Sequence, residues 1–238
     1  MGAVPLIGFG AFVVASLVVG TRLLLAGSRS GALPELVIGT SLLAGGGVGY
    51  LLVVLTLVLH LFPPPMLHAG VFLIYLGTAA TSFGVWRIFR PGQVWAGALC
   101  ALLSAILALA FGARLLASPD ARATSPWHFW PSTIAGTATY AWTALESLRY
   151  HELLRRRVSL DLAEPEMARR FLLWGCSALA AVGIHVSSMM NRFIDPQHIG
   201  PAILALQSLL GLVSAVSIWF AFFPPAWFQR LFAPRAAA

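Results

Sequence analysis

The chain has 238 residues, of which 59% are hydrophobic and only 10% are charged, with a mean hydropathy of +0.85. A water-facing domain carries about 25% charged residues, so this composition excludes an ordinary soluble domain and predicts an integral membrane protein. The formal charge of +7 comes from 15 basic residues that are all arginine. Mechanisms that need a lysine amine, including a retinal Schiff base, are therefore excluded.

Seven apolar runs, separated by short connections that contain proline, glycine or arginine, predict seven membrane-spanning helices. In chain order, the expected spans cover residues 4–26, 34–61, 67–89, 93–117, 129–154, 167–191 and 199–223. About 20 apolar residues cross a bilayer, so these spans leave no room for a second domain. We expect residues 1–238 to form one transmembrane domain, an all-α polytopic seven-helix bundle.

The distribution of arginine predicts the orientation of this bundle. Twelve arginines belong to one side, which also holds the C-terminus: Arg22, Arg29, Arg87, Arg90, Arg149, Arg155, Arg156, Arg157, Arg169, Arg170, Arg230 and Arg235. The other side has only Arg114, Arg122 and Arg192. Positive charge is retained in the cytoplasm, which places the N-terminus outside and the C-terminus inside. The excess of Arg, Ala and Gly without Lys suggests a bacterial chain, and we expect a multi-pass protein of the inner (plasma) membrane with no nucleic-acid partner.

Seven spans with an outside N-terminus resemble the layout of rhodopsins and G-protein-coupled receptors. The resemblance covers the whole chain as architecture and implies a receptor-like bundle. No Asp-Arg-Tyr-like or Asn-Pro-x-x-Tyr-like motif accompanies it. The segments 87–92 and 170–175 are also similar to segments of uncharacterised bacterial multi-span proteins, and that similarity implies no activity.

Polar residues in several spans recur in steps of three and four, which places them on single helix faces. One such face in the second span runs from Glu35 at the cytoplasmic end to His60 at the outer end. A second face, in the fifth span, contains Glu146, with Arg149 one turn further on as its expected ion-pair partner. Charged residues inside a membrane bundle are costly unless paired, so we interpret Glu35, Glu146 and Arg149 as an inner polar rim.

The outer halves of the spans contain the candidate ligand-binding residues. These are His60, His68, Tyr75, Tyr140, His185 and Gln207. We expect them to line an outward-facing pocket for a small molecule in a receptor- or sensor-like protein. Binding would then act on the cytoplasmic stretch 155–170, which is the most polar in the chain. Its arginines are interpreted either as a polybasic patch beside anionic lipid or as a docking site for a cytoplasmic partner.

Three other functions stay open from the sequence. Spans one to three and five to seven share an orientation, and this three-plus-one-plus-three layout resembles that of SWEET-type sugar carriers, so a transporter or channel is the alternative. His60, His68, His128, His185 and His198 map near one side and suggest a metal or haem site, for which His60 with His185 is the pair to test. The segment 175–178 is similar to the Gly-x-Ser of intramembrane serine proteases, but the rest of that pattern is missing, and we expect no enzyme. The two cysteines lie in apolar runs and predict no disulfide.

Overall fold

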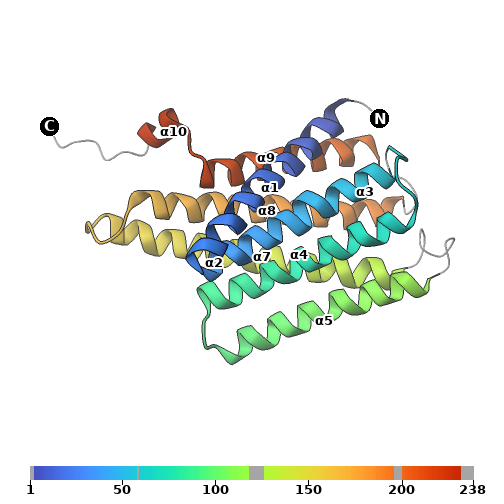
Figure 1. Cartoon of the computed structure of the whole chain (residues 1–238), viewed down its shortest axis with the longest axis horizontal. Helices are drawn as coiled ribbons and strands as arrows, with labels where there is room; N and C mark the ends of the chain where they lie inside the picture. The colour runs from blue at the N-terminus through green and yellow to red at the C-terminus, as the bar shows by residue number, and fades with distance from the viewer. Residues whose placement is uncertain (1–2, 58, 118–125, 196–199, 232–238) are drawn as a thin grey trace.

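The computed structural model describes residues 3–57, 59–117, 126–195 and 200–231. Within these ranges the chain is helical apart from short connections and contains no strand, which confirms the expected all-α fold. The helices are α1 (Ala3–Ser30), α2 (Leu33–Thr40), the π-helix η1 (Ser41–Gly49), α3 (Tyr50–Leu57), α4 (Pro65–Phe89), α5 (Val94–Leu116), α7 (Pro126–Val158), α8 (Pro165–Ile194), α9 (Pro201–Phe222) and α10 (Ala226–Leu231). Of these, α2, η1 and α3 follow one another without a break and form one continuous rod (Figure 1).

In the described part of the chain, six helical segments are long and apolar enough to cross a membrane, as expected for a multi-pass membrane protein. They are α1, the α2–η1–α3 rod, α4, α5, α8 and α9. The helix α7, although 33 residues long, is not among the six. Its first half is rich in Trp, Tyr, Thr and Ser instead of aliphatic residues, and its second half carries Glu and Arg. Length and composition thus do not identify α7, the fifth expected helix, as a span.

The second helix ends earlier than the sequence predicted. The expected span reached residue 61, whereas the helix stops at Leu57 and His60 lies in the following connection with a φ of 53°. Three consecutive prolines begin at residue 63, and a proline disfavours helical backbone in the residue before it. The prediction that His60 lies on a helix face is therefore wrong.

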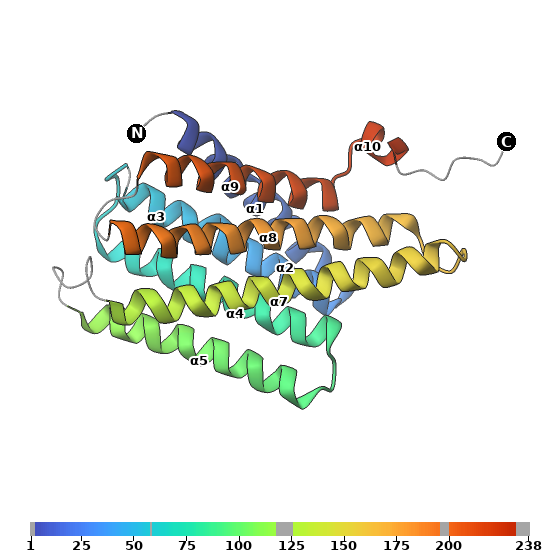
Figure 2. The same ribbon diagram turned by 180° about the vertical axis from the view of Figure 1, so that it is seen from behind.

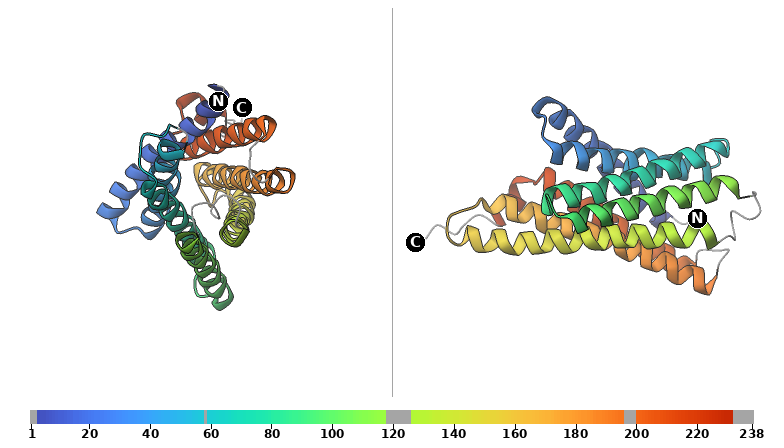
Figure 3. Two further views of the ribbon diagram at one scale, coloured as in Figure 1. Left: turned by 90° about the vertical axis from the view of Figure 1, so that its right-hand side faces the viewer. Right: turned by 90° about the horizontal axis from the view of Figure 1, so that it is seen from below.

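The long helices form a ring in which neighbours pack side by side. α1 packs against the α2–η1–α3 rod, the rod against α4, α4 against α7, α7 against α8, α8 against α9, and α9 back against α1. The helix α5 lies outside this ring, against α4 and α7, as the end-on view in Figure 3 shows. The ring thus contains every long helix except the fourth in chain order.

The two ends of the bundle differ, and we name them by their helix termini. The N end holds the start of α1 and α9, and the hairpin end holds the connection between α7 and α8 (Figure 1). At the hairpin end, α7 and α8 extend beyond the other long helices, which is also visible from behind in Figure 2. This projecting segment, from Val158 to Pro165, falls in the polar stretch singled out in the sequence.

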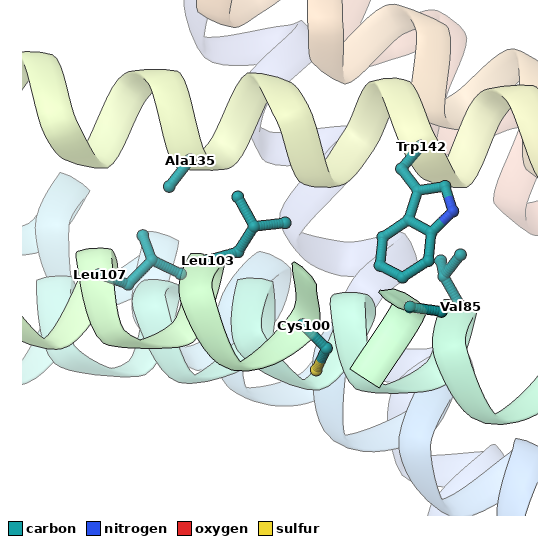
Figure 4. Packing of buried hydrophobic residues seen from close by; sticks show 7 residues of the cluster. Val85, Cys100, Leu103, Leu107, Ala135 and Trp142 are labelled. Carbon is teal, nitrogen blue, oxygen red and sulfur yellow. The ribbon is translucent and has the colours of Figure 1, made fainter. Parts of the chain in front are cut away.

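The contact of α5 with the ring is apolar and well packed. We call it the α5 seam, and its buried members are Val85, Ala96, Cys100, Leu103, Leu107, Ala135 and Trp142. Figure 4 shows Leu103 and Leu107 of α5 facing Ala135 and Trp142 of α7. The seam fixes the face that α4 and α7 turn away from the interior of the ring.

The π-helix crosses α4 at a very short backbone separation. A Cβ atom added at Gly77 would lie 2.6 Å from Cα of Gly45 in η1, so only glycine fits on this side of the crossing. Small residues let membrane helices approach closely, as the glycine-rich second span suggested. A π-helix is rare, and its wider turn offsets the residues that follow it by about one position, roughly 100° around the axis. Tyr50, the first residue after η1, consequently faces the interior of the ring.

Candidate functional site: a row of internal cavities

Three cavities follow one another through the interior of the ring. The N-end cavity has a volume of about 180 Å³, and the middle and hairpin-end cavities have about 70 Å³ each. Tyr50, Thr78 and His185 line both the N-end and the middle cavity. Tyr140 and Ser214 line both the middle and the hairpin-end cavity. Shared walls make the three cavities neighbours in one row, and α1, the rod, α4, α7, α8 and α9 all contribute side chains to it. Leu107 of the α5 seam also lines the N-end cavity.

Hydroxyl groups along this row donate to backbone carbonyls of their own helices. Thr78 Oγ1 donates to the carbonyl of Ile74 at 2.9 Å, and Thr143 Oγ1 donates to that of Thr139 at 2.8 Å. Such a bond satisfies the hydroxyl hydrogen and leaves the oxygen lone pairs able to accept. The lining therefore presents mainly hydrogen-bond acceptors.

His185 on α8 stands between the N-end and middle cavities, and its ring position is fixed from two sides. Its Nδ1 lies 2.8 Å from the carbonyl oxygen of Ala181, which can only accept, so Nδ1 carries the proton. Nε2 faces Gly136 of α7, where an added Cβ atom would lie only 2.5 Å away. The ring also packs at 5.4 Å, centroid to centroid, on Tyr140. In the neutral imidazole, Nε2 is then an acceptor beside the cavity wall.

The three tyrosines of the lining come from three different helices. Tyr75 on α4 interacts through its side chain with Ser132, and Tyr140 on α7 interacts with Thr78. Tyr50 makes an edge-to-face contact with Phe12 at 5.9 Å. These contacts link α1, the rod, α4 and α7 around the widest part of the row.

No residue that lines the three cavities carries a fixed charge. Arg114 on α5 lies outside the lining but interacts electrostatically with Tyr75. At the hairpin end, the Arg90 guanidinium donates to the Glu146 carboxylate at 2.7 Å, with side chains 21% and 11% exposed. The ion pair predicted between Glu146 and Arg149 is thus wrong: Arg149 is exposed, and Arg90 at the end of α4 reaches the carboxylate first.

Aromatic side chains close the row at the hairpin end. Trp174 lines the hairpin-end cavity and packs on Phe89 and Phe171 with ring centroids 5.7 and 6.1 Å apart. Tyr150 packs on the same two phenylalanines at 5.6 and 4.8 Å. This cluster of four rings, the aromatic plug, ties α4 to α7 and α8 beside the Arg90–Glu146 pair.

Of the predicted ligand-binding residues, Tyr75, Tyr140 and His185 line the cavities. Gln207 is buried on α9, and its Nε2 donates at 3.0 Å to Ser188, a wall residue of the N-end cavity. Their binding roles stay predictions. His68 is half-buried on α4 and does not belong to the lining, and His60 is exposed in its connection.

The predicted inner rim is not one cluster in the structure. Glu35 is half-buried at the start of α2, outside the cavity walls, and one of its carboxylate oxygens is buried without a hydrogen-bond partner in the described part of the chain. Among the three predicted rim residues in the described structure, Glu146 alone forms an ion pair, with Arg90. The sequence reasoning also missed Tyr50, because an α-helical count through η1 puts Gly49 on the inner face instead.

The hydroxyls of Ser177 and Ser214 join α8 to α9 with a hydrogen bond of 2.7 Å. Ser177 belongs to the segment that is similar to a Gly-x-Ser motif, and its partner here is another hydroxyl. A serine nucleophile needs an adjacent base, which this contact does not supply. The pair is therefore part of the polar lining.

Among the described residues, no group of three or more His, Cys, Asp or Glu side chains is placed to hold a metal ion. His185 lines two cavities, while its suggested haem partner His60 lies outside them. His128 is buried on α7, and His198 lies outside the described residues.

Comparisons with known proteins add no relative. No protein-family model matches the chain, and no curated protein and no solved structure matches it either.

Proposed function

We propose that this protein is a seven-helix membrane receptor or sensor that binds a small molecule in the N-end cavity. The observation that carries the proposal is a polar-lined cavity of about 180 Å³ inside an otherwise apolar bundle. Polar groups are costly inside a membrane protein, and they concentrate where a ligand, ion or substrate must be held.

In this proposal α7 also crosses the membrane, which brings the number of spans to seven. Its position in the ring explains why it can be less apolar than the other six. Its neighbours α4, α5 and α8 pack against it, and its residues Thr133, Tyr140 and Thr143 line the cavities. A helix that is shielded from lipid in this way tolerates a polar face. In this proposal the N end lies outside and the hairpin end lies in the cytoplasm of a bacterial inner membrane, an orientation that the arginine distribution favours.

The same helices that hold the cavity also form the projecting hairpin. Tyr140 and His185 line the cavity, and their helices α7 and α8 continue through the aromatic plug to the exposed arginines at 155–157. A ligand that favours one packing of Tyr140 on His185 shifts the equilibrium between arrangements of α7 and α8. A cytoplasmic partner bound to residues 155–170 would then bind the two arrangements with different affinity.

The test uses the purified protein in lipid nanodiscs and a panel of neutral, cationic and anionic compounds with up to about ten heavy atoms. Gly136→Ala pushes the His185 ring into the N-end cavity, because the added Cβ atom would otherwise lie 2.5 Å from Nε2. Gly112→Ala on α5 is the matched control, since a Cβ atom there meets nothing within 4 Å. We expect at least one compound to raise the melting temperature of the wild type and of Gly112→Ala but not of Gly136→Ala.

Two further readouts sharpen this test. Native mass spectrometry of the protein in mild detergent detects a ligand retained from the cell. Hydrogen exchange at 155–170 should change when a compound binds, if the hairpin reports on the cavity. The proposal is contradicted if no compound of the panel raises the melting temperature of the wild type more than that of Gly136→Ala.

A carrier is the second candidate, and one observation favours it. The ring consists of the first three and the last three long helices, with α5 outside, so the chain divides as three plus one plus three. The cavity row also continues past Tyr140 to the hairpin-end cavity. In a carrier, Glu146→Gln abolishes solute or proton flux in proteoliposomes while the protein still folds. A wild type without flux under varied gradients leaves the receptor as the better function.

A further inference from the structure

We infer that the N-end cavity accepts an uncharged molecule with one aromatic ring that donates a hydrogen bond to Nε2 of His185. Phenol is the simplest probe of this ligand class. The inference rests on the proposed small-molecule site and adds the chemistry of the ligand.

The volume of the cavity suits a ligand with a single ring. An engineered protein cavity of about 150 Å³ binds benzene, and the N-end cavity measures about 180 Å³. A six-membered ring with one or two substituent atoms fills such a space. The middle cavity, at about 70 Å³, is too small for a second ring and has room for water.

The wall residues suit the faces and edges of an aromatic ring. Tyr50, Tyr75 and Phe129 bring aromatic surfaces from the rod, α4 and α7 to the same cavity. Ile74 and Ile184 add aliphatic surface between them. Aromatic pairs prefer offset or edge-to-face contacts, which side chains from different helices provide more readily than a single stack.

The hydrogen bonds of the lining decide the polarity of the ligand. Ser132 and Thr133 each donate at 2.7 Å to backbone carbonyls, of His128 and Phe129 respectively. Thr78 and Ser188 likewise donate to carbonyls of their own helices. These four hydroxyls have used their hydrogens and can only accept, so a donor on a bound molecule finds several acceptors on this wall.

His185 is the acceptor best placed for that donor. Its Nδ1 hydrogen is used by Ala181, so Nε2 of the neutral ring has a free lone pair. Nε2 makes no hydrogen bond to any residue in the described part of the chain, and it lies against Gly136 on the cavity wall. A ligand hydroxyl that donates to this lone pair gains a hydrogen bond inside the cavity.

The charge of the lining disfavours an ionic ligand. No lining residue is charged, and an ion without a partner is costly to bury. Arg114 interacts with Tyr75 from outside the cavity, and an anion would need this arginine as its counter-ion. Benzoate, which has the same ring and a negative charge, is therefore the critical competitor of phenol.

The experiment measures the affinities of phenol, anisole, toluene and benzoate for the wild type in nanodiscs by calorimetry. Anisole keeps the ring and the oxygen but has no donor. Phenol should bind about tenfold more tightly than anisole or toluene, as expected for one buried hydrogen bond. Binding to Gly136→Ala measures the non-specific uptake of each probe by lipid, and Gly112→Ala should bind like the wild type.

A second variant tests the role of His185 itself. His185→Phe keeps a ring of similar size but removes the acceptor nitrogen. It should bind phenol, anisole and toluene about equally, with toluene affinity close to that of the wild type. The comparison of phenol with anisole in the wild type decides the donor requirement even if this variant does not fold.

The outcomes separate this inference from the proposed function. Equal binding of phenol and anisole by the wild type overturns the donor requirement. Tighter binding of benzoate overturns the uncharged class and gives Arg114 the role of its counter-ion. If none of the four probes binds, but other panel compounds raise the melting temperature of the wild type and not of Gly136→Ala, this inference fails and the small-molecule site stands. If no compound of the panel does so, both fail.

Discussion

The interior of the ring and the α5 seam are built from the same two helices and have opposite characters. α4 turns Thr78 into the ring and Val85 into the seam, and α7 turns Tyr140 inward and Trp142 toward the seam. The ring interior carries polar side chains around its cavities, whereas the buried members of the seam are apolar and closely packed. Apolar packing is enough to associate membrane helices, so a polar lining is not what the association of α4 and α7 with α5 requires. We therefore expect substitutions in the seam to act mainly on stability, and the proposed function assigns ligand binding to the ring interior.

The largest effect on stability is expected in the seam. Leu103→Ala removes a side chain that is only 4% exposed, leaves a void beside α7, and should lower the free energy of unfolding by about 3 kcal/mol. Leu109→Ala on the same helix is the control, because Leu109 is 73% exposed and should change stability little. Unfolding in mixed micelles with increasing denaturing detergent measures both. A loss of ligand binding in folded Leu103→Ala would break the division between seam and ring.

The Arg90–Glu146 pair should have the next largest effect. Glu146→Gln leaves the guanidinium without its charged partner in a site where the two side chains are 21% and 11% exposed. We expect a fall of about 2 kcal/mol in the free energy of unfolding, less than for a fully buried pair because some solvent reaches Arg90.

The Glu166–Arg170 pair gives a matched control. It has the same N···O distance of 2.7 Å, but its side chains are 46% and 52% exposed. Glu166→Gln should change the free energy of unfolding by less than about 0.5 kcal/mol. Equal effects of the two substitutions, measured in the same unfolding assay, would mean that burial at the hairpin end does not strengthen the pair.

The sequence predicted most of the helices well because most of them are long apolar runs between breakers. The expected spans 67–89 and 93–117 differ from α4 and α5 by two residues or fewer at each end. The faces of helices were harder to predict. Tyr75, Tyr140 and His185 line the cavities as expected from regular α-helical spacing. The same spacing predicts the wrong face after η1, because the wider π-helical turn rotates Tyr50 toward the interior. The sequence of residues 41–49 contains no pattern that predicts a π-helix. The close approach of Gly45 to Gly77 depends on α4, which a reading of the second helix alone does not include.

Long-range partners were also beyond the sequence. Arg149, three residues from Glu146, was the natural neighbour in a single helix, whereas the observed partner Arg90 lies 56 residues away. The position of α5 outside the ring is likewise decided by packing, because its composition is as apolar as that of α9.

The crossing of Gly45 and Gly77 should have a smaller effect than the ion pair. Gly77→Ala places a Cβ atom 2.6 Å from the backbone of η1, which has no side chain there that can move aside. We expect a loss of about 1.5 kcal/mol in the free energy of unfolding, a typical cost of overpacking. Gly112→Ala, in open space on α5, should cause no such loss. If Gly77→Ala is as stable as Gly112→Ala, the close approach does not hold the π-helix against α4.

The smallest stability effect is expected for the hydroxyl pair inside the ring. Ser177→Ala and Ser214→Ala each remove one partner of the 2.7 Å hydrogen bond, and a double-mutant cycle should give a coupling of about 0.6 kcal/mol. Ser104→Ala on α5, outside the ring, provides the control.

The Ser177→Ala substitution also distinguishes a receptor from a carrier. Since Ser177 lines the hairpin-end cavity only, its loss leaves ligand affinity at the N-end cavity unchanged in a receptor. In a carrier the solute passes this pair, so the same substitution changes flux far more than it changes stability. A coupling well above 1 kcal/mol would instead make the polar lining part of what holds the ring together, which contradicts the division drawn from the seam.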